Sequence, residues 1–181
     1  SNGGVSEYVV VFATVEPGSG YRGITAFVLE NADQGLSWGP PMRKMGQRAI
    51  VNTELFLDEV RVPASRRLGD EGQGFRGLME TFDRSRVTLG ASATGLARAA
   101  LEYATDYARE RVQFGKPIAE HQAVSFRLAE MALRVDASRL LVHRAARMLD
   151  AGERATKEAA MAKLHASETA MWCTWAALQT L

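Results

Sequence analysis

The sequence predicts an α+β protein in which antiparallel strands, part of a β-barrel or β-sandwich domain, precede an antiparallel bundle of long helices. Eleven of the 16 glycines and four of the five prolines lie in residues 1–75. Alanine is distributed the other way, with 5 in residues 1–75 and 23 in residues 76–181. From Phe75 onward, apolar residues recur mostly every three or four positions, which is the period of a helix face. We therefore expect one domain over residues 1–74 and a second over residues 75–181.

Three segments of the first part have the composition of strands. Residues 8–15, 23–30 and 51–62 are rich in β-branched and aromatic side chains, and the PGSG turn at 17–20 separates the first two. In the third segment Phe56 falls on the face that otherwise alternates as polar. We therefore expect this strand to be covered on both sides.

Three long helices are predicted in the second part. The first begins at Phe75 and ends close to the Gly-Lys-Pro at 115–117, because proline cannot donate the backbone hydrogen bond and clashes with the preceding turn. The second runs from about Glu120 to Asp150, with Gly152 as its stop, and the third begins near Thr156 and continues to the end of the chain. The apolar positions of the three helices are Leu78, Met79, Phe82, Leu89, Ala93, Leu96, Ala100, Ala104 and Tyr107, then Val124, Leu128, Met131, Val135, Leu141 and Ala145, then Ala159, Met161, Leu164, Met171, Trp175 and Leu178.

Composition excludes several classes of protein. Twenty-two Lys and Arg against 21 Asp and Glu leave a net charge of +1, which is not the strong field of a general nucleic-acid binder. Cys173 is the one cysteine, and His143 and His165 have no acidic or cysteine partner at ligand spacing, so no metal site is predicted. No apolar stretch reaches the roughly 20 residues of a membrane span. We expect a soluble, cytoplasmic protein.

Six motifs then occur in a characteristic order. They are MGQRA at 45–49, FLDEVRVP at 56–63, GDEGQGF at 69–75, FDRSR at 82–86, ARERVQFGKPIAEHQAV at 108–124 and KEAAMAKLHASETA at 157–170. In this order and spacing the chain resembles the acyl-CoA dehydrogenases. The resemblance implies the second half of that family's middle β domain, followed by the first three helices of its C-terminal bundle.

The resemblance also implies a reaction in fatty acid metabolism. In the family, a carboxylate removes the α-proton of an acyl-CoA thioester, FAD takes a hydride from the β-carbon, and the electrons pass to an electron-transfer flavoprotein. The catalytic glutamate is expected beyond Leu181, so no catalytic residue is predicted in this chain; Ser85 stands where one branch of the family carries its base, and a hydroxyl cannot serve as that base alone. The alternatives are a non-catalytic or nucleic-acid-associated member of the same scaffold, or an acyl-CoA oxidase.

Five predicted FAD contacts lie in one short segment. A guanidinium suits a pyrophosphate because it donates two parallel hydrogen bonds, and the resemblance gives Arg111 that role. By the same resemblance Gln113 and Phe114 supply a polar and an apolar contact, while His121 and Gln122 contact the flavin from the start of the second helix. The structural alternatives are a solvated Arg111 at a helix end and a Phe114 that anchors the loop.

A sixth predicted FAD contact is Ser1. SNGG resembles the family's Trp-x-Thr-Asn-Gly-Gly strand, in which a hydroxyl donates to the flavin ring. A Ser-Asn start is also common in cloning vectors, in which case Ser1 has no such role.

The predicted substrate contacts are Asp83 and Arg86. They lie three residues apart on one helix face, where an ion pair of small value is the structural alternative. The resemblance places them along the acyl-CoA channel. It also implies that each FAD bridges two subunits of a homo-oligomer, a dimer of dimers, in which the alanine-rich faces pack between subunits; the alternative is that these alanines only pack helices within one bundle.

Overall fold

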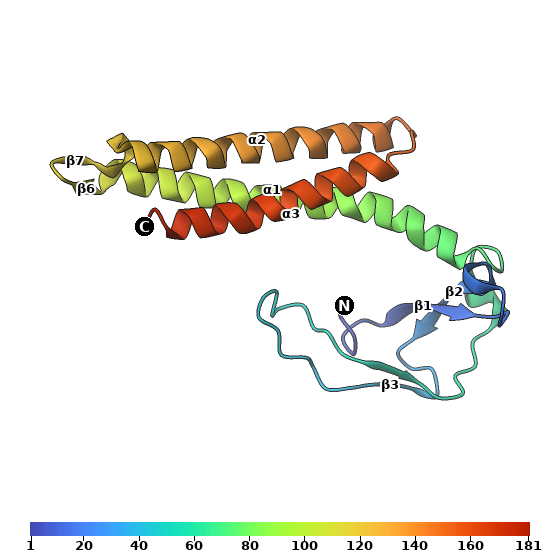
Figure 1. The fold of residues 1–181 in the computed structure, drawn as a ribbon. Helices are drawn as coiled ribbons and strands as arrows, with labels where there is room; N and C mark the ends of the chain where they lie inside the picture. The colour runs from blue at the N-terminus through green and yellow to red at the C-terminus, as the bar shows by residue number, and fades with distance from the viewer. The chain divides into compact units, whose positions relative to one another are not determined.

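The computed structural model describes all 181 residues, Ser1–Leu181, and confirms the predicted α+β class (Figure 1). The elements in order are β1 (Tyr8–Thr14), η1 (Gly20–Gly23), β2 (Ile24–Glu30), β3 (Leu36–Trp38), β4 (Leu55–Leu57), η2 (Ala64–Arg66), β5 (Arg67–Leu68), α1 (Gly74–Glu110), β6 (Val112–Gln113), β7 (Lys116–Pro117), η3 (Ile118–Glu120), α2 (Gln122–Asp150) and α3 (Thr156–Leu178). The chain divides into two compact units, Ser1–Met79 and Glu80–Leu181. Each unit is described by itself.

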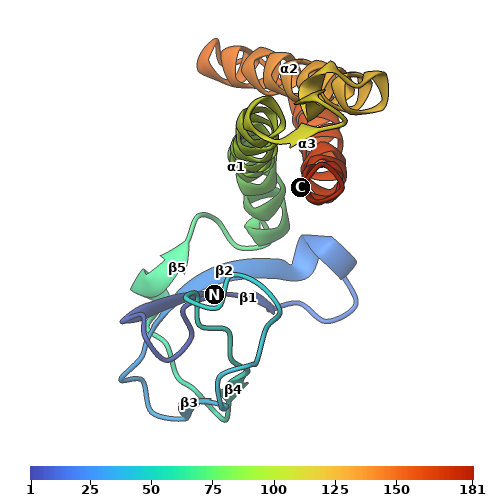
Figure 2. The ribbon, with the colours of Figure 1, turned by 90° about the vertical axis from the view of Figure 1, so that its left-hand side faces the viewer.

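The first unit contains two small antiparallel sheets. β1 pairs along its whole length with β2, from Tyr8 opposite Glu30 to Thr14 opposite Ile24, and the short β5 adds to the other edge of β2 (Figure 2). β3 and β4 form a separate ribbon. Behind β2 the hydroxyl of Thr25 is fully buried and accepts a hydrogen bond from the Gly72 N–H at 2.9 Å, which ties the segment before α1 to the sheet.

The strand predicted over residues 51–62 is much shorter than expected. Only Leu55–Leu57 pairs, and its partner β3 has three residues. The side chains of Phe56 and Leu57 are 51% and 44% exposed, so the expectation that this strand is covered on both faces was wrong. β4 pairs with β3 alone, and about half of Phe56 stays open to solvent.

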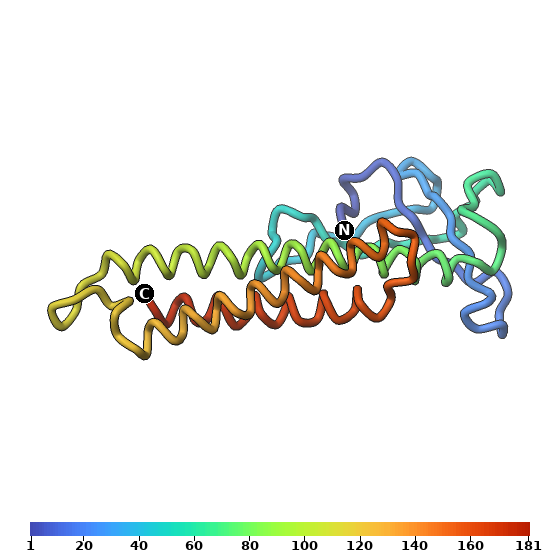
Figure 3. The backbone as a smooth tube through the Cα atoms, turned by 90° about the horizontal axis from the view of Figure 1, so that it is seen from above, coloured from blue at the N-terminus to red at the C-terminus, as the bar shows by residue number.

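The second unit is an antiparallel arrangement of three long helices, which lie side by side in both Figure 1 and Figure 3. α2 ends in a Schellman motif: Gly152, with φ of 74°, donates to the Leu149 carbonyl, and the Glu153 N–H donates to that of Met148. The predicted stop at Gly152 is thereby confirmed. α3 ends at Leu178, three residues before the chain does, because the Thr180 N–H bonds to the Ala177 carbonyl and tightens the last turn.

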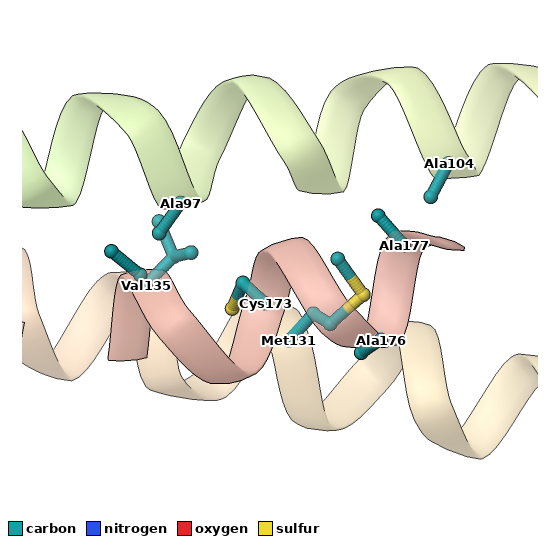
Figure 4. Packing of buried hydrophobic residues seen from close by; sticks show 8 residues of the cluster. Ala97, Ala104, Met131, Val135, Cys173, Ala176 and Ala177 are labelled. Atoms are coloured by element: carbon teal, nitrogen blue, oxygen red, sulfur yellow. The ribbon is translucent and has the colours of Figure 1, made fainter. Parts of the chain in front are cut away.

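The core of this unit is built mainly from small side chains. Met131 and Cys173 are its largest fully buried members, and the other residues packed around them are Ala97, Ala104, Val135, Ala170, Ala176 and Ala177 (Figure 4). A second cluster contains Val87, Val142, Ala145, Ala159 and Ala162. Alanines at the contact let the helix backbones approach closely, which leaves little room for large side chains.

This packing corrects two of the predicted apolar stripes. In α1, Leu89 and Leu96 are 54% and 57% exposed; in α3, Leu164, Met171 and Leu178 are 60%, 74% and 69% exposed. The stripe predicted for α2 is partly or fully buried throughout, as expected. No helix in the structure combines the length and the apolar character that a membrane crossing requires.

Candidate functional site

A β-hairpin with a two-residue turn connects α1 to the segment before α2. Gln113 of β6 lies opposite Lys116 of β7, and Phe114 and Gly115 form the turn between them with φ angles of 54° and 79°. Positive φ at both central residues matches a type I′ turn, in which Asn-Gly is preferred. Here the first position carries a phenylalanine whose side chain is 93% exposed. The hairpin therefore presents an aromatic ring to solvent on a left-handed backbone.

The hairpin is held against the start of α2. The Ile118 N–H donates to the Arg111 carbonyl at 2.8 Å, and Nε2 of His121 bonds the Gln113 carbonyl at 3.2 Å, which makes that ring nitrogen the donor. The ring of His121 also meets Phe114 edge-on, with centroids 6.0 Å apart. Of the five predicted FAD contacts, His121 thus has a structural role: its ring holds the hairpin through the Gln113 carbonyl and the Phe114 ring.

The remaining polar side chains of this segment have no partner in the chain. The side chains of Arg111, Gln113 and Gln122 are exposed and make no hydrogen bond or ion pair, although their backbone carbonyls accept hydrogen bonds. Gln122 is also the first residue of α2, where the N–H groups of Gln122 and Ala123 have no acceptor in the chain and the helix dipole favours anions. A free guanidinium, two free carboxamides and a helix start suit a diphosphate, and the bare Phe114 ring suits a planar base. The residues present therefore fit an anionic dinucleotide such as FAD.

The last turn of α3 lies at the same end of the helical unit. Nη1 of Arg127, in α2, donates to the Gln179 carbonyl at 2.7 Å, and the C-terminus lies close to β6 and β7 in Figures 1 and 3. Arg127 was not among the predicted site residues. An arginine in the second turn of a helix gives no signal in sequence, because such residues are usually solvated.

The predicted substrate pair is more connected than the sequence indicates. Nη1 of Arg86 donates to Oδ1 of Asp83 at 2.9 Å, and the hydroxyl of Thr156 donates to Oδ2 of the same carboxylate at 2.5 Å. Thr156 is the first residue of α3, 73 positions from Asp83. The guanidinium of Arg86 also lies 5.9 Å from the ring centroid of Phe82. Asp83 therefore joins α1 to the beginning of α3.

Ser85, between the two members of that pair, has no acidic or basic partner. Its hydroxyl donates to the Phe82 carbonyl at 3.3 Å, one turn back along α1. This contact supports no proton abstraction.

Ser1 belongs to the other unit and is exposed. The residues after it are tightly packed: Asn2 has a φ of 59°, and a Cβ added to Gly3 would come within 2.3 Å of the Thr53 hydroxyl oxygen and 2.8 Å of the Trp38 ring. Nε1 of Trp38 donates to Oδ1 of Asn31 at 2.5 Å. Gly3 is thus required by the close approach of Thr53 and Trp38. Ser1, two residues earlier, stays exposed.

The Ser138 hydroxyl and the Cys173 thiol are buried between the helices of the second unit. Ser138 is fully buried in α2 and its hydroxyl lies 2.9 Å from Nδ1 of His165 in α3. Burial raises the pKa of the Cys173 thiol, which keeps it protonated and unreactive. The structure contains no group of three His, Cys, Asp or Glu side chains placed to hold a metal ion.

Fold and donor set together define an α+β protein whose helical bundle carries exposed hydrogen-bond donors that suit an anionic dinucleotide. The chain belongs to the acyl-CoA dehydrogenase family: the model of the family's C-terminal domain, "Acyl-CoA dehydrogenase, C-terminal domain", matches residues 72–181. The predicted family is thereby confirmed.

Individual relatives match this chain over nearly its whole length. It is 46% identical over 182 aligned positions to cyclohex-1-ene-1-carbonyl-CoA dehydrogenase of Geobacter metallireducens, covering 100% of this chain and 48% of that protein. Its fold matches butyryl-CoA dehydrogenase from Megasphaera elsdenii with a TM-score of 0.95 and 42% identity, over 99% of this chain and 47% of that one. A structure of PigA with FAD and proline matches with a TM-score of 0.96 and 32% identity, over 99% and 47%. The chain thus spans about half the length of these relatives.

Proposed function

We propose that this chain is part of an FAD-dependent acyl-CoA dehydrogenase, which converts an acyl-CoA to the trans-2-enoyl-CoA and passes the electrons to an electron-transfer flavoprotein. The observation that carries the proposal is the hairpin at the end of α1. The chain belongs to the acyl-CoA dehydrogenase family. Its hairpin presents the guanidinium of Arg111, which has no partner in the chain, and the exposed ring of Phe114 next to the N-terminus of α2.

Each residue of the hairpin would have a distinct part in holding FAD. When bound, FAD supplies the oxidant that accepts a hydride from the β-carbon of the substrate. Arg111 would bind its diphosphate through two parallel N–H donors, and Gln113 and Gln122 would add neutral donors. Phe114 would cover an apolar face of the dinucleotide. His121 would hold the hairpin in place through the Gln113 carbonyl.

Ser1 would act from the strand unit, with its hydroxyl donating to the flavin ring. In the proposed assembly this residue and the hairpin meet one FAD from different subunits.

The substrate would lie along α1. We assign Arg86 the contact with the coenzyme A part of the substrate, and Asp83 the task of holding Arg86, to which it is hydrogen-bonded. We assign the α-proton to a glutamate outside these 181 residues, because the Ser85 hydroxyl bonds the Phe82 carbonyl and has no partner base.

The test is anaerobic titration of the full-length, FAD-loaded protein with thioesters. The panel would contain butyryl-CoA, cyclohex-1-ene-1-carbonyl-CoA and long-chain acyl-CoAs, together with a prolyl thioester because the fold also matches the prolyl acyl carrier protein oxidase AnaB. We expect loss of the oxidised-flavin absorbance with at least one acyl-CoA. Flavin that stays oxidised with every thioester would exclude the activity. Rapid reoxidation of the reduced protein by oxygen would indicate an acyl-CoA oxidase instead.

A further inference from the structure

Both oxygens of the Asp83 carboxylate accept a hydrogen bond within the protein. Oδ1 accepts from Arg86 and Oδ2 accepts from the Thr156 hydroxyl, at 2.9 and 2.5 Å. The side chain of Asp83 is 20% exposed, against 34% for that of Arg86. A carboxylate would in addition repel the phosphates of coenzyme A. Asp83 is therefore poorly suited to touch such a ligand itself.

Arg86 has the opposite properties. A guanidinium carries five N–H donors, and within this chain Arg86 makes one hydrogen bond, to Asp83. That bond and the position over the Phe82 ring restrict the orientation of the guanidinium while most of its donors stay free. The geometry is that of a cation oriented in advance for an external acceptor.

The start of α3 completes this arrangement. Its N-cap residue is Ala155, which has no side chain that could cap the helix. The Asp83 carboxylate lies against the first turn through Thr156, where the helix dipole favours a negative charge. The Thr156 hydroxyl thus fixes the position of the Asp83 carboxylate, and this carboxylate in turn orients the Arg86 guanidinium.

From this chain of contacts we infer that Thr156 is a positioning residue for coenzyme A binding: it holds Asp83, and Asp83 aims Arg86 at the ligand. This inference rests on the proposed function, which places coenzyme A beside Arg86. It adds a residue on a different helix, and it makes the start of α3 part of the substrate site.

The experiment measures binding of coenzyme A itself to the full-length, FAD-loaded protein by isothermal titration calorimetry. Thr156→Val keeps the shape of the side chain and removes the hydroxyl. We expect it to weaken binding about two- to tenfold, the range for one hydrogen bond, without loss of bound FAD. Thr156→Ser restores the hydroxyl and should bind within about twofold of the original protein. In an Asp83→Asn background, Thr156→Val should add less than a further twofold, because both act through one path.

A matched control separates positioning from general destabilisation of α3. Glu158 lies in the same first turn but faces Arg144 of α2, with 3.6 Å between their charged atoms. Glu158→Gln should lower the melting temperature about as much as Thr156→Val does and leave coenzyme A binding unchanged.

The outcomes distinguish this inference from the function on which it rests. If Arg86→Ala loses affinity while Thr156→Val binds like the original protein, Thr156 has no positioning role. If the original protein binds no coenzyme A, both the inference and the proposed substrate site are overturned. Binding with the expected pattern, but no flavin reduction by any thioester, would support the inference and exclude the dehydrogenase activity.

Discussion

At the scale of single residues, two neighbouring arginines allow a direct test of the FAD site. The side chain of Arg111 has no partner in the chain, whereas Nη1 of Arg109 lies 3.8 Å from Oδ1 of Asp106. Arg111→Lys keeps the charge but loses the bidentate geometry, so FAD affinity should fall by roughly 1.5–3 kcal/mol, the value of a charged hydrogen bond. Fluorescence of FAD released on dilution measures the change. Arg109→Lys should retain FAD, and full retention by Arg111→Lys would indicate a solvated side chain.

Phe114 offers a second test because its backbone and its side chain have opposing effects. Its φ of 54° is unfavourable for a phenylalanine by roughly 1–2 kcal/mol, whereas asparagine tolerates this region better. Phe114→Asn should therefore leave the melting temperature unchanged or raise it, while FAD affinity falls. Gly115→Ala, at a φ of 79°, should lower the melting temperature. A Phe114→Asn protein that is less stable would show that the ring is a packing anchor.

At the scale of elements, the turn after β2 is linked to η2 by an acid-sensitive contact. The Glu30 N–H and the Arg66 guanidinium both donate to Asp33, at 2.8 Å each, and they hold the pKa of this carboxyl below its usual value. A lowered folded-state pKa means that the stabilisation is present above the unfolded pKa of about 3.9 and is lost as the pH falls through the folded one.

Asp33→Asn should therefore destabilise the protein at neutral pH and flatten its loss of stability below about pH 4. Thermal unfolding followed from pH 7 to about pH 2.5 measures both effects. The control is Asp58→Asn, at an exposed carboxyl without an ion pair. Equal acid sensitivity in all three proteins would exclude Asp33 as its source.

The alanine contact between the helices predicts a steep response to size. Ala162 of α3 is fully buried, and its backbone lies 3.5 Å from where a Cβ on Gly90 would stand. Ala162→Leu should cost roughly 1–3 kcal/mol of unfolding free energy through overpacking. Ala160→Leu, on the exposed side of the same helix, should change it by less than about 0.5 kcal/mol. Chemical denaturation compares the two, and equal effects would contradict close packing.

At the scale of the whole molecule, the proposed FAD site is completed only by assembly. Ser1 and the hairpin belong to different units of the chain, and the proposal assigns them to one FAD from two subunits. FAD binding should then stabilise the dimer by mass action. Sedimentation of the full-length protein, stripped of FAD and then reloaded, should show a shift from monomer toward dimer or tetramer. A monomer that binds FAD stoichiometrically would rule out a shared site.

The large apolar side chains on the outside of the helices are relevant to the same experiment. Leu133 and Leu140 of α2 and Met171 of α3 are 70%, 63% and 74% exposed within this chain. Contact between subunits would cover such residues in the proposed tetramer. The alanines between the helices are already buried within this one chain, which supports the alternative that they pack helices within one bundle.

The sequence by itself determined the features that depend on neighbours along the chain. Helical periodicity and the glycine stop at Gly152 located the ends of α2 and α3 to within three residues, and the family resemblance of the segment from Arg111 to Gln122 marked it as the candidate FAD segment. Only the tertiary structure showed which side of α1 and α3 is buried. Periodicity finds the stripe with the large apolar residues, whereas the buried contact between the helices is lined mainly by alanines. It likewise decided the partner of Asp83. Thr156 is 73 residues away and carries an ordinary hydroxyl, so no local pattern marks it, and only the antiparallel packing of the helices brings the two together.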